Sequence, residues 1–186
     1  MFRVRPVTLL ACLGGLGLSM AAAPALPQAS RVALPVEREA LAAHNMARVE
    51  AGAVPLIWSE RLARDAQGWA DGLAAQGRFD HAPPGQRRGQ GENLWRGTRG
   101  RWSVEAMIGF FLDERRFFRA GTFPDISATG RWSDVGHYSQ IIWPDTREVG
   151  CALARTPSDE VLVCRYWPAG NVWGQRIEAR PRLSRR

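Results

Sequence analysis

The chain has 186 residues, and 45% of them are hydrophobic, which is enough for one domain with its own core. All 25 basic residues are arginines, and the formal net charge is +7. No basic run is interleaved with aromatic residues, so the charge does not indicate a nucleic-acid surface, and we expect no nucleic-acid partner.

Residues 1–29 have the composition of an export signal. Arg3 and Arg5 form a basic start, and residues 7–23 are apolar and uncharged. A retained membrane anchor is one alternative, although the run is barely long enough to span a bilayer. Lipidation of Cys12, which follows a short apolar run, is another. We expect a cleaved signal peptide, an extracellular or periplasmic protein and no stable membrane span.

Two helices are predicted in the first half of the domain. Residues 36–50 carry apolar side chains at helical spacing, and this helix also bears His44, for which we expect a structural hydrogen bond to a neighbouring loop. Residues 55–58 form a short extended link. The second helix begins after Ser59, a favourable N-cap, and ends at Gly77.

A third helix is predicted from Ser103 to about Arg119. Its apolar stripe includes Met107 and Phe111, and Glu114 falls on the same stripe. Because an unpaired buried carboxylate is costly, Glu114 should have a partner or be partly hydrated. An ion pair with a neighbouring arginine at the rim is the ordinary alternative.

Two more polar residues lie in the glycine-rich stretch between the second and third helices. His81 falls within the loop of residues 78–91, and Glu92 follows directly after Gly91. A single loop histidine or glutamate is a weak signal by itself. The long loop of residues 122–136 is a stronger one, because loops of that length in compact domains are often functional.

Residues 136–143 are predicted to form a strand that is covered on both faces. The stretch is rich in β-branched and aromatic residues, and side-chain alternation would place His137 and Ser139 on one face. A histidine at the mouth of such a strand is either a site residue or a core residue that is satisfied by hydrogen bonds. Both interpretations remain open on this fragment alone.

The last two strands are predicted at residues 149–154 and 161–167, joined by a turn around Pro157. Counting outward from a two-residue turn places Cys151 opposite Cys164. Facing cysteines on adjacent antiparallel strands can be bridged, and an exported protein meets an oxidising compartment. We therefore expect a disulfide between them.

Four stretches together resemble the CAP superfamily, also called the sperm-coating-protein, pathogenesis-related-1 or cysteine-rich secretory protein domain. They are residues 41–58, which begin LAAHN and end PLIW, residues 91–94, GENL, residues 136–143, GHYSQIIW, and residues 164–175, CRYWPAGNVWGQ. We expect a bacterial, secreted, single-domain member with the domain at residues 30–178 and a basic C-terminal tail at residues 179–186.

The resemblance implies an α+β fold, a three-layer α-β-α sandwich with a central antiparallel sheet. It also implies a cleft with two histidines and two glutamates, which map onto His81, Glu92, Glu114 and His137. His81 and His137 could bind a divalent metal such as zinc, weakly and exchangeably, with the glutamates in support.

The family resemblance implies lipid or sterol binding in some members, so the first functional interpretation is a secreted binding module. Phe123 and Ile126 in the loop of residues 122–136 would be its apolar contact. A metal-dependent or serine hydrolase using Ser139 is an alternative, although residues two apart on a strand are poorly placed for a mutual hydrogen bond. A host- or surface-directed protein without catalysis is the other. We favour binding over catalysis and assign no catalytic residue.

Overall fold

A computed structural model describes residues 35–178, so the predicted signal peptide, the alternative at Cys12 and the basic tail lie outside the described residues. The helices are α1 (Pro35–Ala51), α2 (Glu60–Gln76), α3 (Pro84–Arg87), α4 (Val104–Leu112) and α5 (Gly136–Ile142). The strands are β1 (Ile57–Trp58), β2 (Gly91–Thr98), β3 (Gly121–Thr122), β4 (Glu148–Arg155), β5 (Asp159–Trp167) and β6 (Arg176–Ile177). Within residues 35–178, no helix combines the length and apolar character needed to cross a membrane.

The main sheet has the strand order β1-β4-β5-β2. The register predicted for β4 and β5 is confirmed, with Arg155 opposite Glu160 and Cys151 opposite Cys164, and the two cysteines form a disulfide. β2 pairs antiparallel with β5, but β1 runs parallel to β4. The sheet is therefore mixed rather than wholly antiparallel, because β1 reaches β4 through a long crossover and not through a hairpin.

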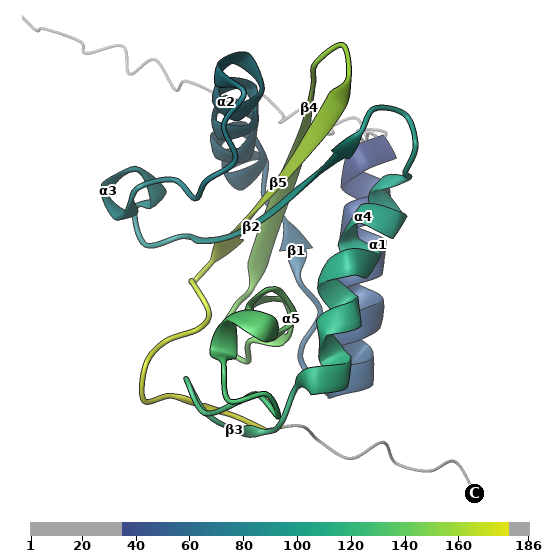
Figure 1. The fold of residues 1–186 in the computed structure, drawn as a ribbon. Coiled ribbons are helices and arrows are strands. Elements are labelled where there is room, and N and C mark those ends of the chain that lie inside the picture. The colour runs from purple at the N-terminus through teal and green to yellow at the C-terminus, as the bar shows by residue number, and fades with distance from the viewer. Residues whose placement is uncertain (1–34, 179–186) are drawn as a thin grey trace, which may run out of the picture. The chain divides into compact units, whose positions relative to one another are not determined.

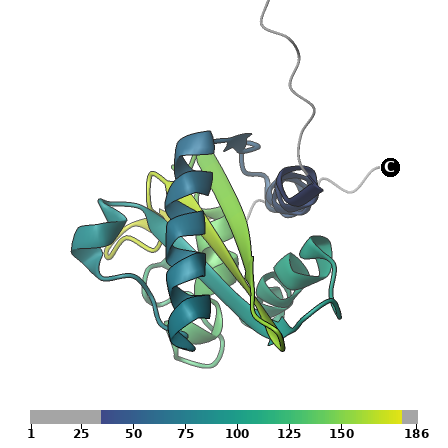
Figure 2. The same ribbon diagram turned by 90° about the horizontal axis from the view of Figure 1, so that it is seen from above.

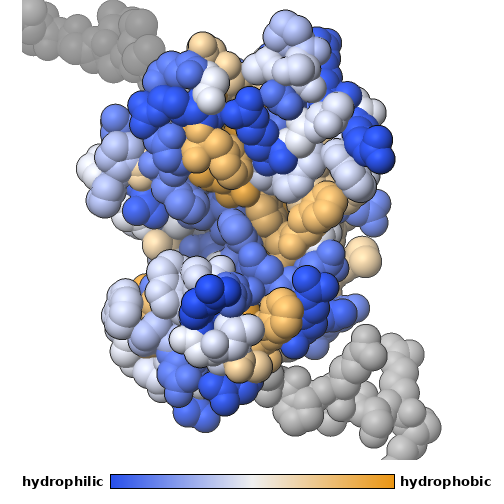
Figure 3. All heavy atoms as spheres, viewed as in Figure 1, coloured by the Kyte–Doolittle hydropathy of each residue, from blue (hydrophilic) through white to orange (hydrophobic). Residues whose placement is uncertain are grey.

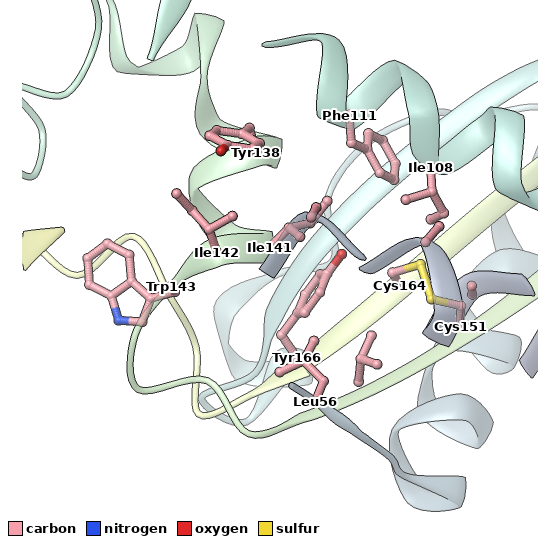
Figure 4. Packing of buried hydrophobic residues seen from close by; sticks show 14 of the residues in the cluster. Leu56, Ile108, Phe111, Tyr138, Ile141, Ile142, Trp143, Cys151, Cys164 and Tyr166 are labelled. Carbon is pink, nitrogen blue, oxygen red and sulfur yellow. A yellow bond between two sulfur atoms is a disulfide. The ribbon is translucent and has the colours of Figure 1, made fainter. Parts of the chain in front are cut away.

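Helices cover both faces of this sheet, which confirms the three layers (Figures 1 and 2). α2 packs on one face through a cluster that includes Ala66, Ala70, Ala152 and Val163. The other face meets α1, α4 and α5 in a larger core, which contains the disulfide and Tyr166 (Figure 4). Successive residues of β4 and β5 alternate between these two clusters, as strand geometry requires.

The segment predicted as a buried strand is the short helix α5, and the strand prediction was wrong. Its residues are buried on nearly all sides, which removes the polar face that would have revealed a helical period. Buried Arg48 holds its C-terminal end by donating to the carbonyls of Ile141 and Trp143 at 2.7 and 2.9 Å. Burial lowers the pKa of Arg48 to about 10.

Two other boundaries differ from the predictions. The third helix begins after Ser103, whose hydroxyl accepts from the N–H of Ala106, but it ends at Leu112 and continues as a 3-10 turn, Asp113–Phe117. No strand was predicted between the second and third helices, yet residues 91–98 form β2, whose hydrogen-bonded partner lies far along the chain in β5. Long-range pairing of this kind leaves little local signal.

Candidate functional site

His81 forms the first of two histidine–carboxylate pairs. Its Nδ1 lies 2.6 Å from Glu92 Oε1, and the backbone N–H of Ala82 donates to the same oxygen at 3.0 Å. A carboxylate oxygen in this position accepts, so Nδ1 carries the proton and Nε2 is left for another partner. The Glu92 side chain is fully buried on β2, whereas 55% of the His81 side chain is exposed.

Buried Arg165 on β5 supports this pair and was missed in the sequence. Its Nη2 lies 2.9 Å from Glu92 Oε2 in an ion pair whose N–H does not point at the oxygen. Burial lowers the pKa of Arg165, and the charge of Glu92 opposes that shift. A charged residue within the apolar run of residues 161–167 was the available signal, because such a residue needs a buried partner.

His137 forms the second pair, with Glu114. Its Nδ1 lies 2.5 Å from Glu114 Oε1, and the backbone N–H groups of His137 and Tyr138 donate to Glu114 Oε2 at 2.9 and 3.1 Å. Glu114 thus both orients an imidazole and satisfies the first N–H groups of α5. The ring of Phe111 stacks on that of His137, with 4.8 Å between centroids. These contacts explain a carboxylate on an apolar stripe.

Both histidines line one cavity of about 490 Å³. Glu92 also lines it, whereas Glu114 is not among its lining residues and meets the cavity through His137. Other walls come from the end of α3, the start of α5 and the segment after β5. The four residues that the resemblance mapped are therefore arranged as two separate pairs whose imidazoles face a common space.

His44 lies outside this cavity and has a structural role. Its Nδ1 donates to the carbonyl of Ala40 at 2.7 Å, so its Nε2 accepts from the Tyr166 hydroxyl at 2.8 Å. Burial lowers its pKa to about 4. Its partners are its own helix and β5 rather than the expected neighbouring loop. Within residues 35–178, one set of three potential metal ligands lies close together, and it consists of His44, Cys151 and Cys164. The two sulfurs of this set are already bonded to each other in the disulfide.

Ser139 does not support a serine hydrolase. It lies on the helix α5 and is fully buried, and its hydroxyl donates to Asn171 Oδ1 at 2.6 Å rather than to a histidine. The parallel arrangement with His137 that a strand would have given is absent. The nucleophile-and-base interpretation therefore has no geometric basis in the described residues.

Comparison with known proteins supports the same fold and family. The chain is 32% identical over 141 residues to pathogenesis-related protein 1B of Nicotiana tabacum, covering 75% of this chain and 79% of the relative. It is 31% identical over 179 residues to GLIPR1-like protein 1 of Bos taurus, covering 87% and 71% respectively. Among solved structures, that of BmVAL-1 has a TM-score of 0.64 at 22% identity, with coverage of 81% of this chain and 84% of the other. The structure described as "NaASP2 with Zn2+" has a TM-score of 0.64 at 23% identity, with coverage of 84% and 90%.

The family model for the cysteine-rich secretory protein family matches residues 41–166. That range contains both histidine–carboxylate pairs and both bridged cysteines, and it spans the sheet and the helices on both its faces. The sequence match and the layered fold therefore agree, and the chain belongs to the cysteine-rich secretory protein, or CAP, family.

Proposed function

We propose that this domain is an exported binding module whose cleft binds one exchangeable divalent ion, zinc, between His81 and His137. The main support for this proposal is that a carboxylate is bonded to Nδ1 of each imidazole, which leaves both Nε2 atoms for ligation. Metal-binding histidines commonly donate their other N–H to a carboxylate in this way. A similar fold is described with Zn2+.

The two supporting carboxylates differ in burial. Glu92 is fully buried beside Arg165, whereas Glu114 is partly exposed and accepts from the backbone of α5. Two histidines leave open coordination positions, so binding should be modest and exchangeable, unlike that of a closed structural zinc site. The disulfide supports export, because structural disulfides persist in oxidising compartments.

Calorimetric titration with zinc tests the proposal. Replacing His81 or His137 by alanine should abolish binding, and Glu92→Gln should weaken it roughly 10- to 100-fold. His44→Gln is the matched control, because this histidine lies outside the cleft. Protons compete with zinc for the imidazole nitrogens, so zinc affinity should fall as the solution is acidified. Zinc binding by the double variant His81→Ala/His137→Ala that equals the parent's would contradict the proposal.

Lipid binding is a second candidate function, but not at the predicted place. Phe123 and Ile126 are buried in the core, so the predicted apolar contact was wrong; these side chains fill the space between the loop and the helices instead. On the face drawn in Figure 3, hydrophobic residues form patches separated by hydrophilic ones. A lipid would therefore need a groove rather than a broad apolar surface.

Such a groove of about 550 Å³ lies between α1 and α4. Its walls include the small residues Ala47, Ala106 and Gly109, which leave room for an acyl chain, and the charged residues Glu105, Asp113 and Arg115. A Cβ on Gly109 would meet no atom within 4 Å, so Gly109→Phe should fill the groove while the fold is kept. Mass spectrometry of lipids bound to the purified protein should detect less lipid on this variant. Gly68→Phe, at an equally open position on α2, is the control; equal lipid on all three proteins would contradict the groove.

A further inference from the structure

Two tryptophans form an aromatic wall on the cavity that holds the histidines. Trp173 is 70% exposed and Trp132 is 42% exposed, and both line that cavity. Both rings rest on buried Phe123, with centroids 5.6 and 5.3 Å away. Large aromatic surfaces are usually buried in a core or an interface, so their exposure on a cleft wall indicates a ligand-binding surface.

The segment that carries Trp173 is fixed in place. Asn171 holds a left-handed backbone conformation with φ of 55°, and its side-chain amide donates to the carbonyl of Gly136 at 2.8 Å. The N–H of Gly174 donates to the carbonyl of Phe123 at 3.0 Å. Positive φ at a non-glycine residue costs energy that the surrounding bonds must offset, and such residues gather at binding sites. The backbone on both sides of the exposed indole of Trp173 is therefore held in place.

Much of the remaining lining is polar and includes His81, Glu92 and Gln90. An acyl chain in the cavity would bury the Nε2 of His81, which Glu92 does not contact, without a hydrogen-bond partner. Among the described residues that line the cavity, Arg87 alone carries a permanent positive charge, which is too little for a phosphate backbone beside Glu92. The fitting ligand therefore has one flat apolar face and a polar rim.

We propose that this cleft binds a saccharide, with a β-linked pyranose ring stacked on Trp173 and Trp132. The C–H groups of an all-equatorial pyranose form a flat, slightly positive face that suits the negative face of an indole. Its hydroxyl groups leave the ring edgewise, where the imidazoles of His81 and His137 can pair with them. The inference rests on the proposed binding cleft, and hydroxyl oxygens would also suit the open positions of an ion held by the histidines.

Saturation-transfer NMR with cellotetraose and chitotetraose tests this inference on the whole protein, with zinc and after treatment with EDTA. The ring C–H protons of a bound sugar should receive saturation from the indoles. Trp173→Ala should weaken binding by about 10-fold or more, the scale of stacking on one aromatic side chain, and Trp173→Phe should retain part of it. Trp102→Ala is the control, because Trp102 is 38% exposed but does not line the cavity.

The outcomes separate this inference from the zinc proposal. Sugar binding by zinc-free protein that Trp173→Ala removes supports the aromatic wall even if calorimetry finds no zinc site. Failure of both sugars to bind the parent, with or without zinc, overturns the saccharide inference even if zinc binds to the histidines. Binding that is equally strong in the parent and in Trp173→Ala, with folding verified by circular dichroism, also overturns it.

Discussion

The buried imidazole of His44 should make the fold sensitive to acid. Its pKa in the folded protein is lowered to about 4, mainly by burial, from a value near 6.5 in the unfolded chain. Between these two pH values, His44 is therefore protonated in the unfolded chain and neutral in the folded protein. The stability from neutral His44 is fully present above pH 6.5 and is lost as pH falls toward 4. The loss should reach about 2 kcal/mol between pH 7.5 and 5, and about 3 kcal/mol by pH 4.

Urea unfolding of the parent and of His44→Gln, measured at intervals from pH 7.5 to 4, isolates this contribution. Glutamine has no titrating group and its side-chain oxygen can accept from the Tyr166 hydroxyl, and both proteins keep His81 and His137. As pH falls from 6.5 to 4, the free energy of unfolding should decrease more steeply in the parent than in His44→Gln. The difference between the two slopes should correspond to about one bound proton. Parallel curves for the two proteins over this range would mean that folding does not change the pKa of His44.

Three further predictions concern stability. The Cys151–Cys164 disulfide closes a separation of 13 residues, so the unreduced protein should show no free thiol from this pair, and replacing both cysteines by alanine should lower the free energy of unfolding by about 3 kcal/mol. Arg48→Met should cost about 3 kcal/mol or more in chemical denaturation, because several buried carbonyls lose their donor, whereas the exposed control Arg61→Met should cost less than about 1 kcal/mol. Glu114→Ala should cost about 1–2 kcal/mol by the same measurement, since it removes the acceptor at the start of α5; an unchanged midpoint would show that water replaces it.

Local chemistry explains which parts of the fold were predictable. The turn around Pro157 and the apolar runs beside it determined the register of β4 and β5, so the facing cysteines followed. Regular apolar spacing likewise revealed α2, which ends at Gly77 as predicted, with that glycine in a left-handed conformation. These features depend on residues that are neighbours in the chain.

The segment of α5 was misread because its stability comes from elsewhere in the chain. Glu114 satisfies its first N–H groups and Arg48 its last carbonyls, and neither partner is close in sequence. Seven residues buried on most sides carry no clear period. Within the site, the anomaly of Glu114 was visible in the apolar stripe, while His81 and Glu92 depended on the resemblance.

In the proposed function, His81 and His137 bind one zinc ion through their Nε2 atoms. This coordination can be observed in crystals of the protein soaked in zinc, with anomalous diffraction recorded on both sides of the zinc absorption edge. We predict one strong peak in the cleft at about 2.0–2.1 Å from Nε2 of both histidines, with Glu92 and Glu114 still bonded to Nδ1. A cleft without a peak, or a peak that contacts neither histidine, would contradict the claim.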